Sequence, residues 1–124
     1  MLSHMKTTTE MLQTAETMAT AKASSMCDGA LDSIAKGRKT FVKGKPVFVP
    51  LTDEKRTEIK GLQLSLFVPD GTFVRSQAEA IVGDVDALFA TMGEDAAQDL
   101  GDEIVAAYCA AGRAEIERRF AEVL

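Results

Sequence analysis

The stretch Thr40-Phe41-Val42-Lys43-Gly44-Lys45-Pro46-Val47-Phe48-Val49 predicts a β-hairpin in the middle of the chain. Its β-branched and aromatic residues favour extended backbone, and the Lys43-Gly44 pair between them is typical of a tight turn. Pro46 has no amide hydrogen to donate, so its strand is expected to lie at an edge of the sheet or to begin there. Because the segments on both sides have helical patterns, this hairpin indicates an α+β domain.

A second pair of strands is expected after the hairpin, with a short helix in between. Thr52-Asp53-Glu54 predicts the start of that helix, which reaches Lys60 and ends at Gly61. Leu62–Val68 and Thr72–Arg75 are predicted strands. They are joined by a turn at Pro69-Asp70-Gly71, because proline presets φ and glycine supplies a positive φ. The expected sheet therefore has about four short antiparallel strands.

A long helix is predicted before the hairpin. Thr7-Thr8-Thr9-Glu10 is a capping-box pattern, in which a hydroxyl and a carboxylate accept hydrogen bonds from amides that the first turn leaves unpaired. Apolar residues then recur with a period near 3.6, and Gly37 is suited to end the helix. The apolar stripe consists of Met11, Leu12, Ala15, Met18, Ala19, Met26, Ala30, Leu31 and Ile34.

Two helices are predicted after the sheet and are expected to pack on one of its faces. The first begins at the capping pattern Ser76-Gln77-Ala78-Glu79 and ends at Gly93, and the second runs from about Glu94 to the end of the chain. Gly112 falls on the apolar face of the second helix, which predicts a close helix crossing or a break at this residue. That face consists of Leu100, Ile104, Tyr108, Ile116 and Phe120.

The length of 124 residues corresponds to one domain, and residues 5–124 are expected to form it. Residues 1–4 are interpreted as a remnant of a cloning junction, because Ser3-His4-Met5 contains the one histidine of the chain. Without it the domain has no imidazole, the commonest general base and metal ligand. Cys27 and Cys109 are too far apart for a zinc motif and are expected to be buried thiols. We therefore expect no enzyme activity, no cofactor and no metal.

The sequence predicts a cytoplasmic protein without a membrane partner. The longest uninterrupted apolar run, Ile104–Ala111, is far shorter than a membrane span. The polar residues Thr7-Thr8-Thr9-Glu10 lie where a signal peptide would be apolar. Two widely spaced cysteines are also compatible with a reducing compartment.

Charge is distributed unevenly along a chain whose net charge is −5. Residues 36–60 carry a net charge of +5, whereas residues 76–112 contain eight acidic residues and no basic one. Cations around an aromatic residue on a hairpin are typical of a surface that contacts phosphates or a protein partner. That candidate surface consists of Lys36, Arg38, Lys39, Phe41, Lys43 and Lys45. A candidate acidic partner surface, with carboxylates at helical spacing, consists of Asp95, Asp99, Asp102 and Glu103.

Three functions are compatible with these patterns. The first is a small non-catalytic binding or regulatory protein that acts through protein–protein contacts. We expect it to be a homodimer, because three amphipathic helices need more cover than a sheet of short strands provides. The second is an accessory protein that contacts nucleic acid through the basic hairpin, and a hairpin standing clear of the acidic helices would favour it. The third is a small-molecule-binding or enzymatic domain, which a pocket lined by convergent carboxylates would favour.

Overall fold

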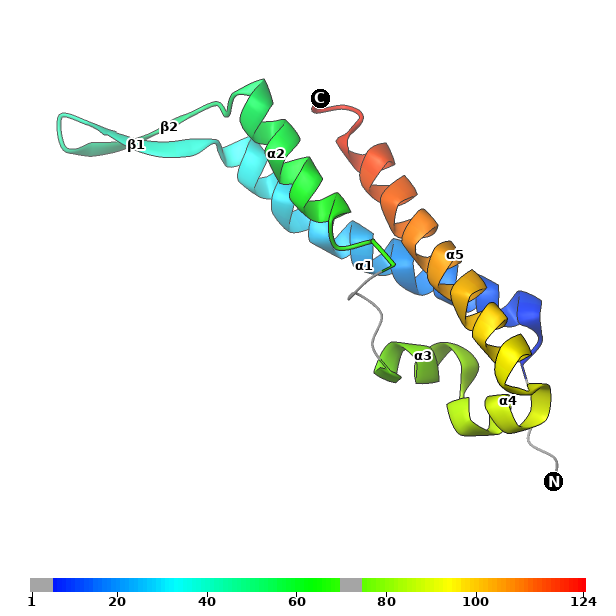
Figure 1. Ribbon diagram of the computed structural model, residues 1–124. Helices are drawn as coiled ribbons and strands as arrows, with labels where there is room; N and C mark the ends of the chain where they lie inside the picture. The colour runs from blue at the N-terminus through cyan, green and yellow to red at the C-terminus, as the bar shows by residue number, and fades with distance from the viewer. Residues whose placement is uncertain (1–5, 70–74) are drawn as a thin grey trace.

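The computed structural model describes residues 6–69 and 75–124 of the chain. In chain order its elements are α1 (Thr8–Lys36), β1 (Arg38–Val42), β2 (Lys45–Val49), α2 (Asp53–Leu64), α3 (Arg75–Val82), α4 (Val85–Met92) and α5 (Glu94–Phe120). The two long helices α1 and α5 lie side by side (Figure 1). The α2 helix packs against both of them, α3 packs against α1, and α4 packs against α5. The domain is therefore α+β in class, but helices make up most of it.

The predicted start and end of α1 are confirmed. Thr7 Oγ1 accepts a hydrogen bond from the Glu10 amide, and Glu10 Oε1 accepts one from the Thr7 amide, both at 3.1 Å. The helix ends before Gly37, whose φ of 80° suits glycine. A Cβ atom at this position would lie 2.2 Å from the Val49 carbonyl oxygen. Glycine is thus required where the helix passes into the hairpin.

The predicted hairpin is confirmed, and we call residues 38–49 the arm. Its strands β1 and β2 are antiparallel, with Phe41 opposite Pro46. Lys43 and Gly44 form the turn with φ values of 53° and 77°. Two consecutive positive φ values match the right-handed twist of the strands, which explains why a Lys-Gly pair can close this hairpin.

The predicted four-stranded sheet is wrong, because the described residues contain a sheet of two strands. The α2 helix does not end at Gly61 but continues to Leu64, and turns follow at 65–69 in place of the predicted strand Leu62–Val68. The alternation of apolar residues there reflects the last turn of α2 followed by Phe67, which turns into the core. Of the predicted second hairpin, residues 70–74 lie outside the described residues, as do residues 1–4.

The single helix predicted between residues 76 and 93 is also wrong. The α3 helix begins at Arg75 and ends at Val82, and the helical conformation is interrupted at Gly83 before α4 starts. Asp84 caps the new helix, because its Oδ1 accepts a hydrogen bond from the Ala87 amide at 3.0 Å. The predicted end before Gly93 is confirmed. The continuous apolar stripe concealed this break, since each short helix buries an apolar residue, Ile81 in α3 and Leu88 in α4.

The core lies between α1 and α5. The buried residues of α1 recur every fourth position, and the small side chains among them allow α5 to approach closely. They are Met11, Ala15, Ala19, Ala23 and Cys27. The predicted apolar face of α5 is confirmed as buried, and so is the burial of Cys27 and Cys109 as free thiols. The two helices point the same way, because Arg119 near the end of α5 hydrogen-bonds Ser24 and Asp28 in the second half of α1.

The two C-terminal helices do not pack on a face of the sheet, as the sequence had predicted. Figure 1 shows the arm extending from the end of α1, away from α3 and α4. All the residues of β1 and β2 are exposed or half-buried. Among the described residues, no helix has both the length and the apolar character needed to cross a bilayer.

Candidate functional site

The candidate site is the arm, which carries the basic residues predicted from the sequence except Lys36, the last residue of α1. The structure brings these residues together at one end of the molecule (Figure 1). Lys36, on the last turn of α1, forms a 3.1 Å ion pair with Asp32. The side chains of Arg38, Lys39, Lys43 and Lys45 are all exposed. The arm itself contains no acidic residue, so its cations face solvent and form a positive surface.

One face of the arm is aromatic. Successive side chains of a strand point to opposite faces, so the pairing of Phe41 with Pro46 and of Lys39 with Phe48 places these four residues together. Phe41 is 64% exposed and Phe48 is 57% exposed. Lys39 Nζ lies 5.5 Å from the centre of the Phe41 ring, within the range of a cation–π contact. The arm thus exposes two aromatic rings beside a cation.

The other face of the arm is also partly apolar. Val42 and Val47 both lie on it and both are exposed. A two-stranded hairpin is marginally stable in water unless a third strand or a helix covers it. Within the described residues no helix packs on either face. The apolar residues of the arm therefore form a surface suited to contact another molecule.

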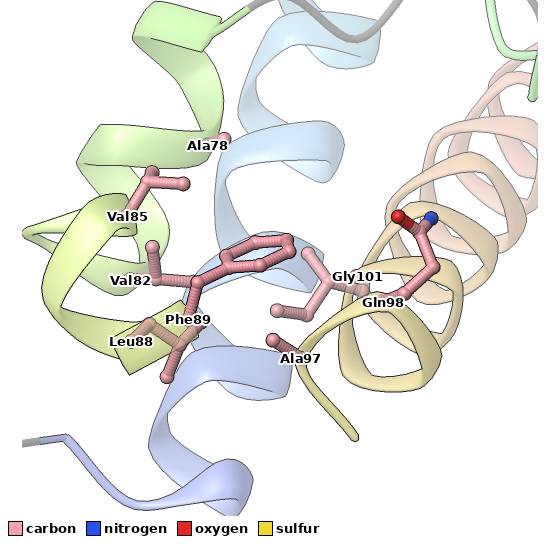
Figure 2. Close-up of a pocket in the computed structure, with 9 residues that line it drawn as sticks. Ala78, Val82, Val85, Leu88, Phe89, Ala97, Gln98 and Gly101 are labelled. Carbon is pink, nitrogen blue, oxygen red and sulfur yellow. The ribbon is translucent and has the colours of Figure 1, made fainter. Parts of the chain in front are cut away.

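A second feature lies at the opposite end of the domain, where α3, α4 and α5 enclose an apolar hollow of about 100 Å³. Figure 2 shows side chains of α3 and α4 facing α5 across it, with the Phe89 ring pointing toward α5. Gln98 is the one polar residue of its lining. The lining residues are Ala78, Val82, Val85, Leu88, Phe89, Ala97, Gln98, Gly101 and Ile104.

Acidic residues are absent from this lining but are next to several of its residues in the sequence. Glu79 follows Ala78 in the chain, Asp84 and Asp86 flank Val85, and Asp102 follows Gly101. All four carboxylates are exposed. Each of these four residues is therefore a sequence neighbour of a lining residue, with the two Cα atoms about 3.8 Å apart. We use the name acidic rim for Glu79, Asp84, Asp86 and Asp102.

The acidic surface predicted on α5 consists of carboxylates that face solvent. Asp95, Asp99, Asp102 and Glu103 are all exposed. Asp102 Oδ1 accepts a hydrogen bond from Gln98 Nε2 at 3.3 Å, which connects it to the hollow. These residues and the basic arm lie at opposite ends of the domain, so the structure does not bring the two predicted surfaces together within one chain (Figure 1).

Two other carboxylates, which the sequence did not single out, line a depression between α1 and α5. They are Glu16 and Glu115. Glu115 is 8% exposed, and both its oxygens accept hydrogen bonds from Arg118, at 2.6 and 3.0 Å. These bonds lower the pKa of Glu115, although burial opposes them. Glu115 therefore stays ionised near neutral pH and cannot supply a proton as a general acid.

The Glu115–Arg118 pair predicts an acid-dependent loss of stability. A carboxyl whose pKa is lower in the folded state stabilises the fold above its unfolded pKa, about 4.3 for glutamate, and loses this contribution as pH falls through the folded pKa. We expect Glu115→Gln to be less stable than the wild type at pH 7, with the difference shrinking below about pH 4.3. Urea unfolding of both proteins from pH 7 to pH 3 measures this. A difference that does not change with pH would show that Glu115 acts by packing alone.

The described residues contain no candidate metal centre. Within 6–69 and 75–124 there is no group of three or more histidine, cysteine, aspartate or glutamate side chains that could hold a metal ion. The residues that the sequence analysis missed are the exposed Phe48 and the lining of the hollow. The Gly83-Asp84 break was the signal that could have located the hollow.

The chain matches no protein-family model, no curated protein and no solved structure, so its function must be inferred from its own geometry.

Proposed function

We propose that this protein is a non-catalytic binding protein that docks its arm into a protein partner. The observation that carries the proposal is the exposure of Phe41 and Phe48 on one uncovered face of a two-stranded hairpin. Aromatic residues of this kind anchor protein interfaces, because each buries a large apolar area when a partner covers it. The cations beside them would form the polar rim that sets orientation and association rate.

The residues that line the hollow and the depression between α1 and α5 support a binding role rather than catalysis. The hollow between α3, α4 and α5 is lined by apolar residues and Gln98, not by carboxylates. In the depression between α1 and α5, Glu115 forms an ion pair with Arg118. Glu16 also lines that depression, but the bonds from Arg118 lower the pKa of Glu115, so this carboxyl is not available as the protonated partner that acid–base chemistry uses.

Nucleic acid is a second candidate partner, and a specific observation favours it. The basic arm stands clear of the acidic helices (Figure 1), as expected of a β-ribbon that enters a groove. Against it, Phe41, Val42, Val47 and Phe48 are exposed over both faces of the arm. Bases can stack on the two aromatic rings, but stacking and phosphate contacts leave Val42 and Val47 uncovered, whereas a protein groove would cover them. We therefore place the protein partner first.

The proposal is tested by capture with the full chain as bait, from a lysate of the native cell treated with nuclease. We expect a protein that binds the wild type and whose recovery falls at least tenfold with Phe41→Ser/Phe48→Ser, because an apolar anchor is worth more than about 1.4 kcal/mol. The matched control is Leu62→Ser, which changes an exposed apolar residue outside the arm and should leave recovery unchanged.

Direct titration with duplex and single-stranded DNA separates the two candidates. If nucleic acid is the partner, binding should weaken steeply with salt, and Arg38→Ala/Lys39→Ala/Lys43→Ala should flatten the salt dependence by up to about three units. We expect no measurable DNA binding at physiological salt. A dissociation constant below about 1 µM there would contradict the protein-docking proposal.

A further inference from the structure

The arm and the hollow have complementary chemistry. The arm exposes apolar and aromatic side chains beside the cations Arg38, Lys39, Lys43 and Lys45. The hollow is apolar, and the four exposed carboxylates of the acidic rim belong to residues next to its lining in the sequence. An apolar cavity of roughly 150 Å³ accepts a benzene molecule. The hollow, at about 100 Å³, is smaller and would take up the edge of a phenylalanine ring rather than the whole ring.

The two surfaces cannot meet within one chain. Lys6, just before α1, donates a hydrogen bond to the Ile81 carbonyl at 3.2 Å, which holds the end of α3 near the start of α1. The arm begins after the other end of α1. The 29 residues of α1 span about 44 Å at about 1.5 Å per residue. Each strand of the arm has five residues and spans about 17 Å. Figure 1 shows the arm pointing away from α3 and α4.

We infer that the occupant of the hollow is the arm of a second copy of this chain. This inference rests on the proposed function and names its partner. Phe41 or Phe48 of one copy would enter the hollow of the other, while the arm cations face the acidic rim. Because the arm and the hollow lie at opposite ends, two copies placed antiparallel can exchange arms, and each contact then occurs twice.

The charges on the chain favour this occupant. The arm carries no acidic residue, and residues 76–112 carry no basic one. Opposite potentials attract a second copy in this orientation, and like charges disfavour contact of arm with arm or of hollow with hollow. Phe89, which lines the hollow and is 36% exposed, would extend the apolar contact.

The test uses one variant on each side of the contact. Phe41→Ser/Phe48→Ser removes the aromatic anchors, whereas Gly101→Leu fills the hollow. A Cβ at Gly101 meets no atom within 4 Å, and Gly101 lies in the interior of α5, so leucine should be accepted there. Gly29→Leu is the matched control, because Gly29 is also a helical glycine with open space around it.

Light scattering and sedimentation of the full chain at about 1–100 µM should show a wild-type dimer that weakens with salt. Each of the two site variants should raise the dimer dissociation constant at least tenfold, whereas Gly29→Leu should not change it. A mixture of the two site variants should form a heterodimer, because the intact arm of one fits the intact hollow of the other. This recovery would not follow if either variant were merely misfolded.

Two results would overturn the inference. One is a wild-type chain that is strictly monomeric at about 100 µM in low salt, well above common dimer dissociation constants. The other is self-association that neither variant weakens. If the chain is monomeric but its arm still captures another protein, the inference fails and the proposed function stands. If neither occurs, both fail.

Discussion

Replacing Phe67 with alanine is expected to lower the free energy of unfolding by about 3–5 kcal/mol, a large part of the stability of a domain of this size. Phe67 is 1% exposed, and its ring lies 5.8 Å from the ring of Tyr108, measured between centroids. It belongs to the turn after α2 and inserts between helices that would otherwise leave a cavity. Urea unfolding, monitored by circular dichroism, measures the loss.

The control for this prediction is Phe41→Ala, which removes the same side chain from the arm. Phe41 is 64% exposed, so its removal leaves no cavity and should change the stability of the monomer by less than about 0.5 kcal/mol. The measurement should be made on dilute protein, because any partner of the arm would add to the stability of the wild type. Equal losses for the two variants would show that Phe67 does not hold the core together.

The features predicted correctly depend on residues that are neighbours in the sequence. The capping box of Thr7 and Glu10, the Lys43-Gly44 turn and the end of α1 at Gly37 are confirmed for this reason. Each is decided by the φ preferences or hydrogen-bonding groups of a few consecutive residues. The buried face of α5 was predictable because helical periodicity repeats over many turns.

The errors arose where a residue's partner is distant in the sequence. Leu62–Val68 has the composition of a strand, but Phe67 is drawn into the core by contacts with α5, which no local pattern shows. The prediction that helices cover the sheet failed for a related reason. Apolar residues such as Phe41 and Phe48 indicate that a strand will be covered, but not that the cover must come from another molecule.

The candidate site was predictable in part. The sequence located the basic residues of the arm, because a run of cations on a hairpin is exposed in nearly any fold. The hollow was not predicted, because it requires the break at Gly83, the packing of α3 against α1 and the packing of α4 against α5. The acidic rim could be recognised only once the lining of the hollow was known, because its residues are the sequence neighbours of lining residues from three helices.

Gly112→Ala is expected to destabilise the fold by about 1–3 kcal/mol through overpacking. A Cβ at Gly112 would lie 2.1 Å from Cδ1 and 2.2 Å from Cε1 of Phe67, where the ring already fills the space. The sequence predicted a close helix crossing or a break at this residue. The α5 helix is continuous there, and the close contact is with an aromatic side chain. The ring is enclosed by the core and cannot move aside freely.

The sign of this effect is what distinguishes Gly112 from other helical glycines. A Cβ added at Gly29 in α1 would meet no atom within 4 Å, so Gly29→Ala should stabilise the protein by about 0.5–1 kcal/mol. Opposite signs at two glycines in helix interiors would exclude helix propensity as the cause.

The double variant Gly112→Ala/Phe67→Leu tests whether the cost arises from the contact with Phe67. Because leucine lacks the ring edge that meets the new Cβ, the combined loss should be smaller than the sum of the two single losses. Additive losses would instead place the cost of Gly112→Ala somewhere other than its contact with Phe67.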